Sequence, residues 1–172
     1  MLHSLVSEDC ARALAKLAQS TPAGAFVEVG VYHGGTAWHL AQVAQAQGRP
    51  CYLYDTFTGI PYRGELDSHR VGDFADTSVE EVKTAIPYAT VVAGIFPDSA
   101  VEMGPVAFVH LDVDQYRSYR EALAYFQPRM VEGGVIWCDD VGCLAGADAA
   151  VKEFCQTHRL IPIVAEKTYI RF

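Results

Sequence analysis

The chain has 172 residues, which is enough for one domain and too short for two ordinary ones. Of these residues 51% are hydrophobic and 20% charged, a composition typical of a soluble globular protein. Its formal net charge of −8 argues against nucleic-acid binding, because phosphate recognition needs a basic surface. No apolar run approaches the roughly 20 residues of a membrane span, so we expect no membrane partner.

The cysteines and the N-terminus indicate a cytoplasmic protein. The five cysteines include no C-x-x-C pair, which is typical of reduced thiols and not of a disulfide scaffold. The N-terminal residues carry early acids, Glu8 and Asp9, and lack the apolar core of a signal peptide.

Apolar periodicity and turn residues predict helices and strands in alternation. Helices are expected at 7–19, 36–47, 78–86, 117–126 and 145–157. Strands are expected at 25–29, 51–54, 90–93, 106–111 and 135–138, and residues 160–165 and 169–172 are spaced as an antiparallel hairpin. This order predicts a single α/β domain over 1–172, with a doubly wound, mostly parallel sheet, a C-terminal hairpin and an N-terminal helical segment at 1–22.

Residues 56–77 have no clear period and are long for a connection in a compact domain. Long connections of this kind are usually functional loops. The part at 62–77 contains Arg63, His69 and Arg70, and we predict that it is a lid over the site.

Four carboxylates follow two neighbouring strands of the predicted sheet. Asp112 and Asp114 come after the strand at 106–111, and Asp139 and Asp140 come after the strand at 135–138. Open α/β sheets bind ligands at this edge, and adjacent strands lie about 5 Å apart, so the acids can share one cation. Oxygen ligands of this type suit Mg²⁺. The alternative is that the acids cap the following helices and turns, with Asp114 the best candidate for that role.

A glycine-rich turn follows the strand at 25–29. Its glycines, Gly30, Gly34 and Gly35, do not fit the dinucleotide fingerprint G-x-G-x-x-G, which gives little support to phosphate binding. Glu28, near the end of the strand, suits a cation or a ligand amine, and the alternative is a solvated side chain. His33 either meets a ligand or is an ordinary loop residue.

Asp55 ends the strand at 51–54, where α/β domains that bind nucleosides hold the two ribose hydroxyls. The alternative is that Asp55 caps a turn. His110 lies inside a predicted strand, and we expect it to be a core histidine. The chain contains neither the nucleophile elbow G-x-S-x-G nor a P-loop, which argues against those classes of hydrolase.

Six blocks in a fixed order resemble the macrocin O-methyltransferase (TylF) family, whose members are class I S-adenosylmethionine-dependent enzymes. The blocks are V-E-V-G-x-x-x-G-G from Val27, L-Y-D-T-F-x-G-I-P from Leu53, G-x-F-x-D from Gly94, L-D-x-D-x-Y-x-S from Leu111, P-R-x-x-x-G-G-V-I-x-x-D-D from Pro128, and G-A-x-x-A-V-x-x-F from Gly146. The resemblance covers nearly the whole chain from Ala25 onward.

The resemblance implies a Rossmann-like sheet in the order 3-2-1-4-5-7-6 and transfer of a methyl group to a hydroxyl of a small molecule, such as a sugar or natural product. It assigns the cofactor S-adenosylmethionine to Glu28, Gly30 and Gly34 for the methionine part, Asp55 and Phe57 for the ribose, and Ile95 for the adenine. It assigns Mg²⁺ to Asp112, Asp139 and Asp140. Catechol O-methyltransferases use a similar acidic trio.

In the expected reaction, Mg²⁺ orients the acceptor hydroxyl in line with the sulfonium methyl. Asp112 is the first candidate for the general base, followed by Asp114 and His33. The alternatives are a catechol-like phenol acceptor, a non-catalytic domain that binds S-adenosylmethionine, and a nicotinamide-dependent oxidoreductase, which the glycine pattern disfavours. Position 33 is His where many relatives carry Arg, so the acceptor is left open.

Three tyrosines of the fourth predicted helix, Tyr116, Tyr119 and Tyr125, are expected to be exposed. Exposed aromatic side chains of this kind could pair two copies of the chain in a homodimer.

Overall fold

The protein is described by a computed structural model that covers residues 3–172. In these residues one seven-stranded sheet has the strand order β3-β2-β1-β4-β5-β7-β6. The helices are α1 (Glu8–Gln19), α2 (Gly35–Ala46), α3 (Val79–Ala85), α4 (Tyr116–Phe126) and α5 (Ala145–His158), with a 3₁₀ turn η1 (Gln127–Arg129). The strands are β1 (Ala25–Val29), β2 (Cys51–Asp55), β3 (Thr90–Ala93), β4 (Val106–Leu111), β5 (Met130–Cys138), β6 (Ile163–Val164) and β7 (Thr168–Arg171).

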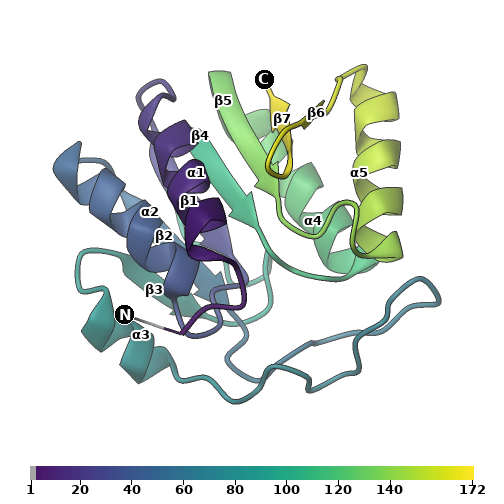
Figure 1. Cartoon of the computed structure of the whole chain (residues 1–172), viewed down its shortest axis with the longest axis horizontal. Helices are drawn as coiled ribbons and strands as arrows, with labels where there is room; N and C mark the ends of the chain where they lie inside the picture. Colours follow the sequence, from purple (N-terminus) through teal and green to yellow (C-terminus); the bar gives the residue numbers. More distant parts are fainter. Residues whose placement is uncertain (1–2) are drawn as a thin grey trace.

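The strand order and the terminal hairpin confirm the predicted fold class. β3, β2, β1, β4 and β5 are mutually parallel, and β7 runs antiparallel to both β5 and β6. Helices cover both faces of the sheet, with α1, α2 and α3 on one side and α4 and α5 on the other (Figure 1). The carboxyl ends of the five parallel strands therefore meet at one edge.

Two strands differ from their predicted lengths. β5 begins at Met130 and not at residue 135, because Gly133 adopts a φ of +79° and the pairing with β4 shifts register between Val106 and Phe108. An irregular strand of this kind does not show the alternation by which a strand is recognised. β6 has only two residues, so the predicted strand at 160–165 is mostly loop.

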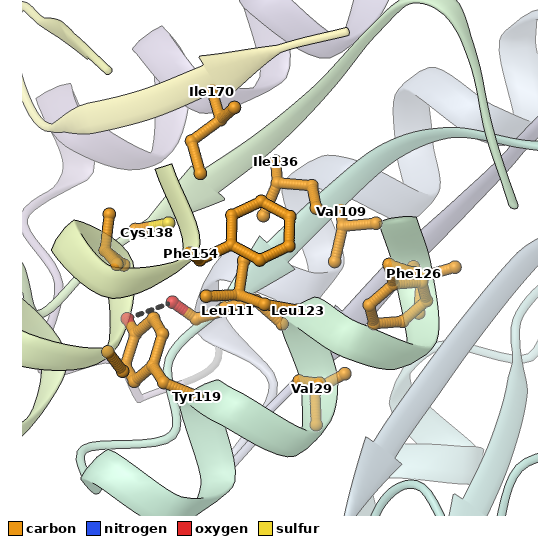
Figure 2. Packing of buried hydrophobic residues seen from close by; sticks show 14 of the residues in the cluster. Val29, Val109, Leu111, Tyr119, Leu123, Phe126, Ile136, Cys138, Phe154 and Ile170 are labelled. Atoms are coloured by element: carbon orange, nitrogen blue, oxygen red, sulfur yellow. Dashed lines mark hydrogen bonds between the residues drawn. The ribbon is translucent and has the colours of Figure 1, made fainter. Parts of the chain in front are cut away.

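Tyr119 is buried, and the prediction that it is exposed was wrong. It shares one face of α4 with Leu123 and Phe126, at the helical spacings i+4 and i+7. All three side chains have 0% exposure, while Tyr116 and Tyr125 are half-buried. The hydroxyl of Tyr119 lies 2.9 Å from the carbonyl oxygen of Leu111 (Figure 2), so its polar end has a partner inside the core.

Leu123 lies at the centre of the core between the sheet and the helices α4 and α5 (Figure 2). We expect Leu123→Ala to lower the free energy of unfolding by about 2–5 kcal/mol, because the truncation leaves a cavity in a closely packed interior. Urea denaturation measures the loss. Leu66→Ala is the control, since Leu66 is 46% exposed. A loss equal to that of the control would contradict the assigned packing.

Among the described residues, no helix is both long and apolar enough to cross a membrane. All five cysteines are free thiols.

Candidate active site

A cavity of about 570 Å³ opens at the carboxyl edge of the parallel strands. Each of the five parallel strands contributes lining at or just beyond its end: Val29, Asp55, Ile95, Asp112 and Asp139. Cavities of roughly 300–1,000 Å³ are typical of sites for small molecules and cofactors. The edge that the sequence predicted is therefore hollow and large enough for a cofactor.

Asp55 organises the glycine-rich turn. Its Oδ2 accepts hydrogen bonds from the backbone N–H groups of Val31 and Tyr32, each at 2.8 Å, and its Oδ1 accepts one from Phe57 N–H at 2.8 Å. A carboxylate has about four acceptor positions, so about one is left for a ligand. Asp55 thus caps the turn, as the alternative interpretation expected, and it also lines the cavity.

The acidic trio of Asp112, Asp139 and Asp140 is brought together by the ends of β4 and β5. Each offers one carboxylate oxygen, and these atoms all lie within 4.8 Å of one another. Loss of hydration, together with the carboxylate of Asp140, raises the pKa of Asp112 well above its ordinary value. Among the described residues, no hydrogen-bond donor contacts the Asp112 side chain. A carboxylate without a donor, crowded by two others, fits a hard cation.

Asp140 is held by the turn and by α4. Its Oδ2 accepts a hydrogen bond of 3.0 Å from Asp114 N–H and lies 2.9 Å from the hydroxyl of Tyr119. The core tyrosine therefore positions the second member of the trio.

Asp139 belongs to a row of charged and titratable side chains that runs from the buried Glu28 through His110 to Lys167. Its Oδ1 lies 3.7 Å from Nε2 of His110, whose Nδ1 lies 3.3 Å from Oε2 of Glu28, and its Oδ2 lies 2.9 Å from Nζ of Lys167. Burial alone would lower the pKa of His110, but Glu28 and Asp139 outweigh it and raise this pKa well above its ordinary value. His110 is buried, as expected for a core histidine, but it also links Glu28 to the acidic trio.

Glu28 lies below the cavity and does not line it. Its side chain is fully buried, and its Oε1 accepts a hydrogen bond of 2.6 Å from the hydroxyl of Thr36. Glu28 therefore is not a solvated side chain. Glu28 lies against His110, which in turn lies near Asp139 of the acidic trio. Its direct contact with the cofactor stays a prediction.

The other predicted residues divide into two groups. Gly30, Ile95 and Asp114 line the cavity. Gly34, Phe57 and His33 are outside the lining: Gly34 caps α2, Phe57 packs against the core under α1 and α2, and the ring of His33 packs 4.1 Å from that of Tyr32. Their roles in binding and catalysis stay predictions.

Asp114 lies at the contact between the acidic edge and the lid. Its backbone has a φ of +58°, and burial and the charge of Asp140 raise its pKa to about 7. Its Oδ1 lies 3.4 Å from Nε2 of His69, a cavity residue contributed by the lid. Asp114 thus supports the turn and also faces the cavity.

The predicted lid at 62–77 is tied to α4 through Asp67. This side chain is buried, with Oδ1 accepting from Tyr116 N–H at 2.9 Å and Oδ2 accepting from Gly64 N–H at 2.7 Å. His69 and Phe74 of the same segment line the cavity. The anchored loop fixes one wall of the site.

Sequence reasoning gave no role to several other residues of the lining. Leu5, Val6 and Cys10 reach it from the N-terminal segment, and Lys167 reaches it from the hairpin. For Lys167 the one signal in the sequence is a single basic residue in the turn of the C-terminal hairpin, between β6 and β7.

Comparisons with known proteins agree with this geometry. The sequence profile of the macrocin-O-methyltransferase (TylF) family matches residues 7–166. A curated relative, the 8-demethyl-8-(2,3-dimethoxy-alpha-L-rhamnosyl)-tetracenomycin-C 4'-O-methyltransferase of Streptomyces olivaceus, is 31% identical over 154 residues. That match covers 77% of this chain but 58% of the relative, so the chain spans little more than half of that protein.

Solved structures share the fold. The O-methyltransferase NovP superposes with a TM-score of 0.85 at 21% identity, covering 99% of this chain and 81% of that one. The O-methyltransferase TomG from Streptomyces achromogenes, solved in complex with SAM, has a TM-score of 0.64 at 16% identity and covers 96% and 79% of the two chains. Because the family profile spans nearly the whole chain, this protein belongs to the macrocin O-methyltransferase (TylF) family.

Proposed function

We propose that this chain transfers a methyl group from S-adenosylmethionine to a hydroxyl of a small molecule, a sugar or other natural product. The observation that carries the proposal is one cavity that joins a cofactor-type turn, at Gly30 and Asp55, to the acidic trio. The family match supports the reaction class. The rhamnosyl substrate of the Streptomyces olivaceus relative supports a sugar acceptor, and the SAM complex of TomG supports the donor.

In this proposal the two reactants contact different lining residues of the cavity. Gly30, Asp55 and Ile95 form the side proposed for the cofactor, whose sulfonium would present an electrophilic methyl group when bound. His69 and Phe74 form the lid side proposed for the acceptor. The apolar and aromatic parts of this wall exclude water, and the carboxylates orient the hydroxyl, which is the positioning that methyl transfer requires.

The acidic trio is proposed to hold a divalent cation such as Mg²⁺. Such an ion would lower the pKa of an acceptor hydroxyl and orient it. The missing hydrogen-bond donor at Asp112 supports this assignment. Asp112 stays the first candidate for the proton acceptor, with Asp114 second because it lines the cavity. His33 has the least support, because it lies outside the lining.

Methyl transfer tests the proposed function directly. The protein is incubated with S-adenosylmethionine, Mg²⁺ and two sets of acceptors, rhamnosides and catechols. Mass spectrometry is expected to show an acceptor heavier by one methylene, formed in equal amount to S-adenosylhomocysteine. Methylation of the catechols alone would favour the phenol acceptor. Binding of S-adenosylmethionine without turnover on either set would favour a non-catalytic domain.

A further inference from the structure

Lys167 places an ammonium group within the acidic edge of the cavity. The hairpin brings it there: Thr168 of β7 pairs with Cys138 of β5 in antiparallel register, so the next residue along each strand end, Lys167 and Asp139, lie side by side. Nζ of Lys167 donates to the carbonyl oxygen of Asp139 at 2.7 Å and to its Oδ2 at 2.9 Å. The sheet topology thus fixes this contact.

Both oxygens of the Asp139 carboxylate lie near basic side chains. Oδ2 faces Lys167, and Oδ1 faces His110, which is fully buried and backed by Glu28. The carboxylate of Asp139 therefore already has an ammonium partner within the protein.

Asp112 and Asp140 are in a different position. No donor contacts the side chain of Asp112 among the described residues, and Asp140 receives only uncharged donors, from Asp114 N–H and Tyr119. The three carboxylates therefore differ. Asp112 and Asp140 have no positively charged partner among the described hydrogen-bond donors, whereas Asp139 has Lys167.

We propose that Lys167 is a built-in cation that competes with a divalent ion for Asp139 and so weakens metal binding at the acidic trio. The inference rests on the metal site of the proposed function. A metal ion that binds Asp139 would have to displace the ammonium group or bind beside it. Displacement breaks the ion pair between Lys167 and Asp139, and binding beside the ammonium group brings two positive charges close together. The Lys167 side chain is 25% exposed and lines the cavity, so it has room to move aside.

Mn²⁺ is the probe, because its free form is measured directly by electron paramagnetic resonance without cofactor, acceptor or turnover. Lys167→Met removes the charge and keeps most of the apolar stem. We expect it to bind Mn²⁺ about tenfold more tightly than the unaltered chain, the effect of one close charge. Lys167→Gln is a second neutral variant, in case the methionine perturbs folding, and Lys167→Arg keeps the charge and is expected to bind as weakly as the unaltered chain.

Lys152→Met is the matched control, because Lys152 is exposed on α5, and its affinity is expected to be unchanged. Equal Mn²⁺ affinity in the unaltered chain and both neutral variants would overturn the role of Lys167 and leave the metal site standing. Weaker binding in both neutral variants would also overturn it, by showing that Lys167 supports the ion. No binding by any of these proteins would overturn this inference together with the metal part of the proposed function.

Discussion

Gly30→Ala is expected to be the most damaging of the glycine-to-alanine substitutions in the described part of the chain. Gly30 has a φ of +89°, and a Cβ added there would lie 1.7 Å from the carbonyl oxygen of Asp112. No flexible side chain can move to relieve this overlap, because the backbone of residue 30 fixes the Cβ and the oxygen belongs to the backbone of Asp112. We expect a loss of more than about 4 kcal/mol in the free energy of unfolding, measured by urea denaturation, or failure to fold.

Gly48→Ala separates the overlap from the backbone conformation. Gly48 also has a positive φ, +64°, but an added Cβ would meet no atom within 4 Å. Only the strain of the left-handed conformation remains there, about 1–2 kcal/mol. If the two substitutions lower the free energy of unfolding equally, the close contact between residue 30 and the Asp112 carbonyl oxygen would be contradicted.

Asp112→Asn is expected to separate activity from stability. The rate of methyl transfer should fall by about 10²–10⁴, the range for loss of a positioned acid or base, as followed by release of S-adenosylhomocysteine. The melting temperature should stay the same or rise, because the substitution removes a charge that burial and Asp140 oppose.

Glu102→Gln is the control, since Glu102 is exposed and lies outside the cavity lining, and it should keep full activity. An Asp112→Asn protein that retains its rate would remove Asp112 from the chemistry. One that unfolds would show that the carboxylate has a structural role.

The fold was predictable because its signals are local. Apolar strands, turn residues and helical periodicity lie within short windows of sequence, and parallel strands must end at one edge. Strand order along the sequence is therefore enough to predict that Asp112 and Asp139 lie together at that edge. The length of β5 was not predictable, because its register shift depends on the pairing with β4.

The rest of the site depends on contacts between distant residues. Asp67 caps α4 from a loop 49 positions earlier in the chain, and nothing near either residue signals that pairing. The charged row through His110 needs the register of β1 against β4, which aligns Glu28 with His110. Lys167 reaches Asp139 only because β7 lies beside β5. Tyr119 is buried because its place on the helix face, and not its residue type, decides its exposure.

Calorimetric titration with S-adenosylhomocysteine and, separately, NAD⁺ tests most directly whether this cavity is a methyltransferase site. We predict that S-adenosylhomocysteine binds one site per chain with a Kd tighter than about 100 µM, equivalent to about −5.5 kcal/mol, and that NAD⁺ gives no heat of binding. Binding of NAD⁺ without binding of S-adenosylhomocysteine would contradict the proposed function.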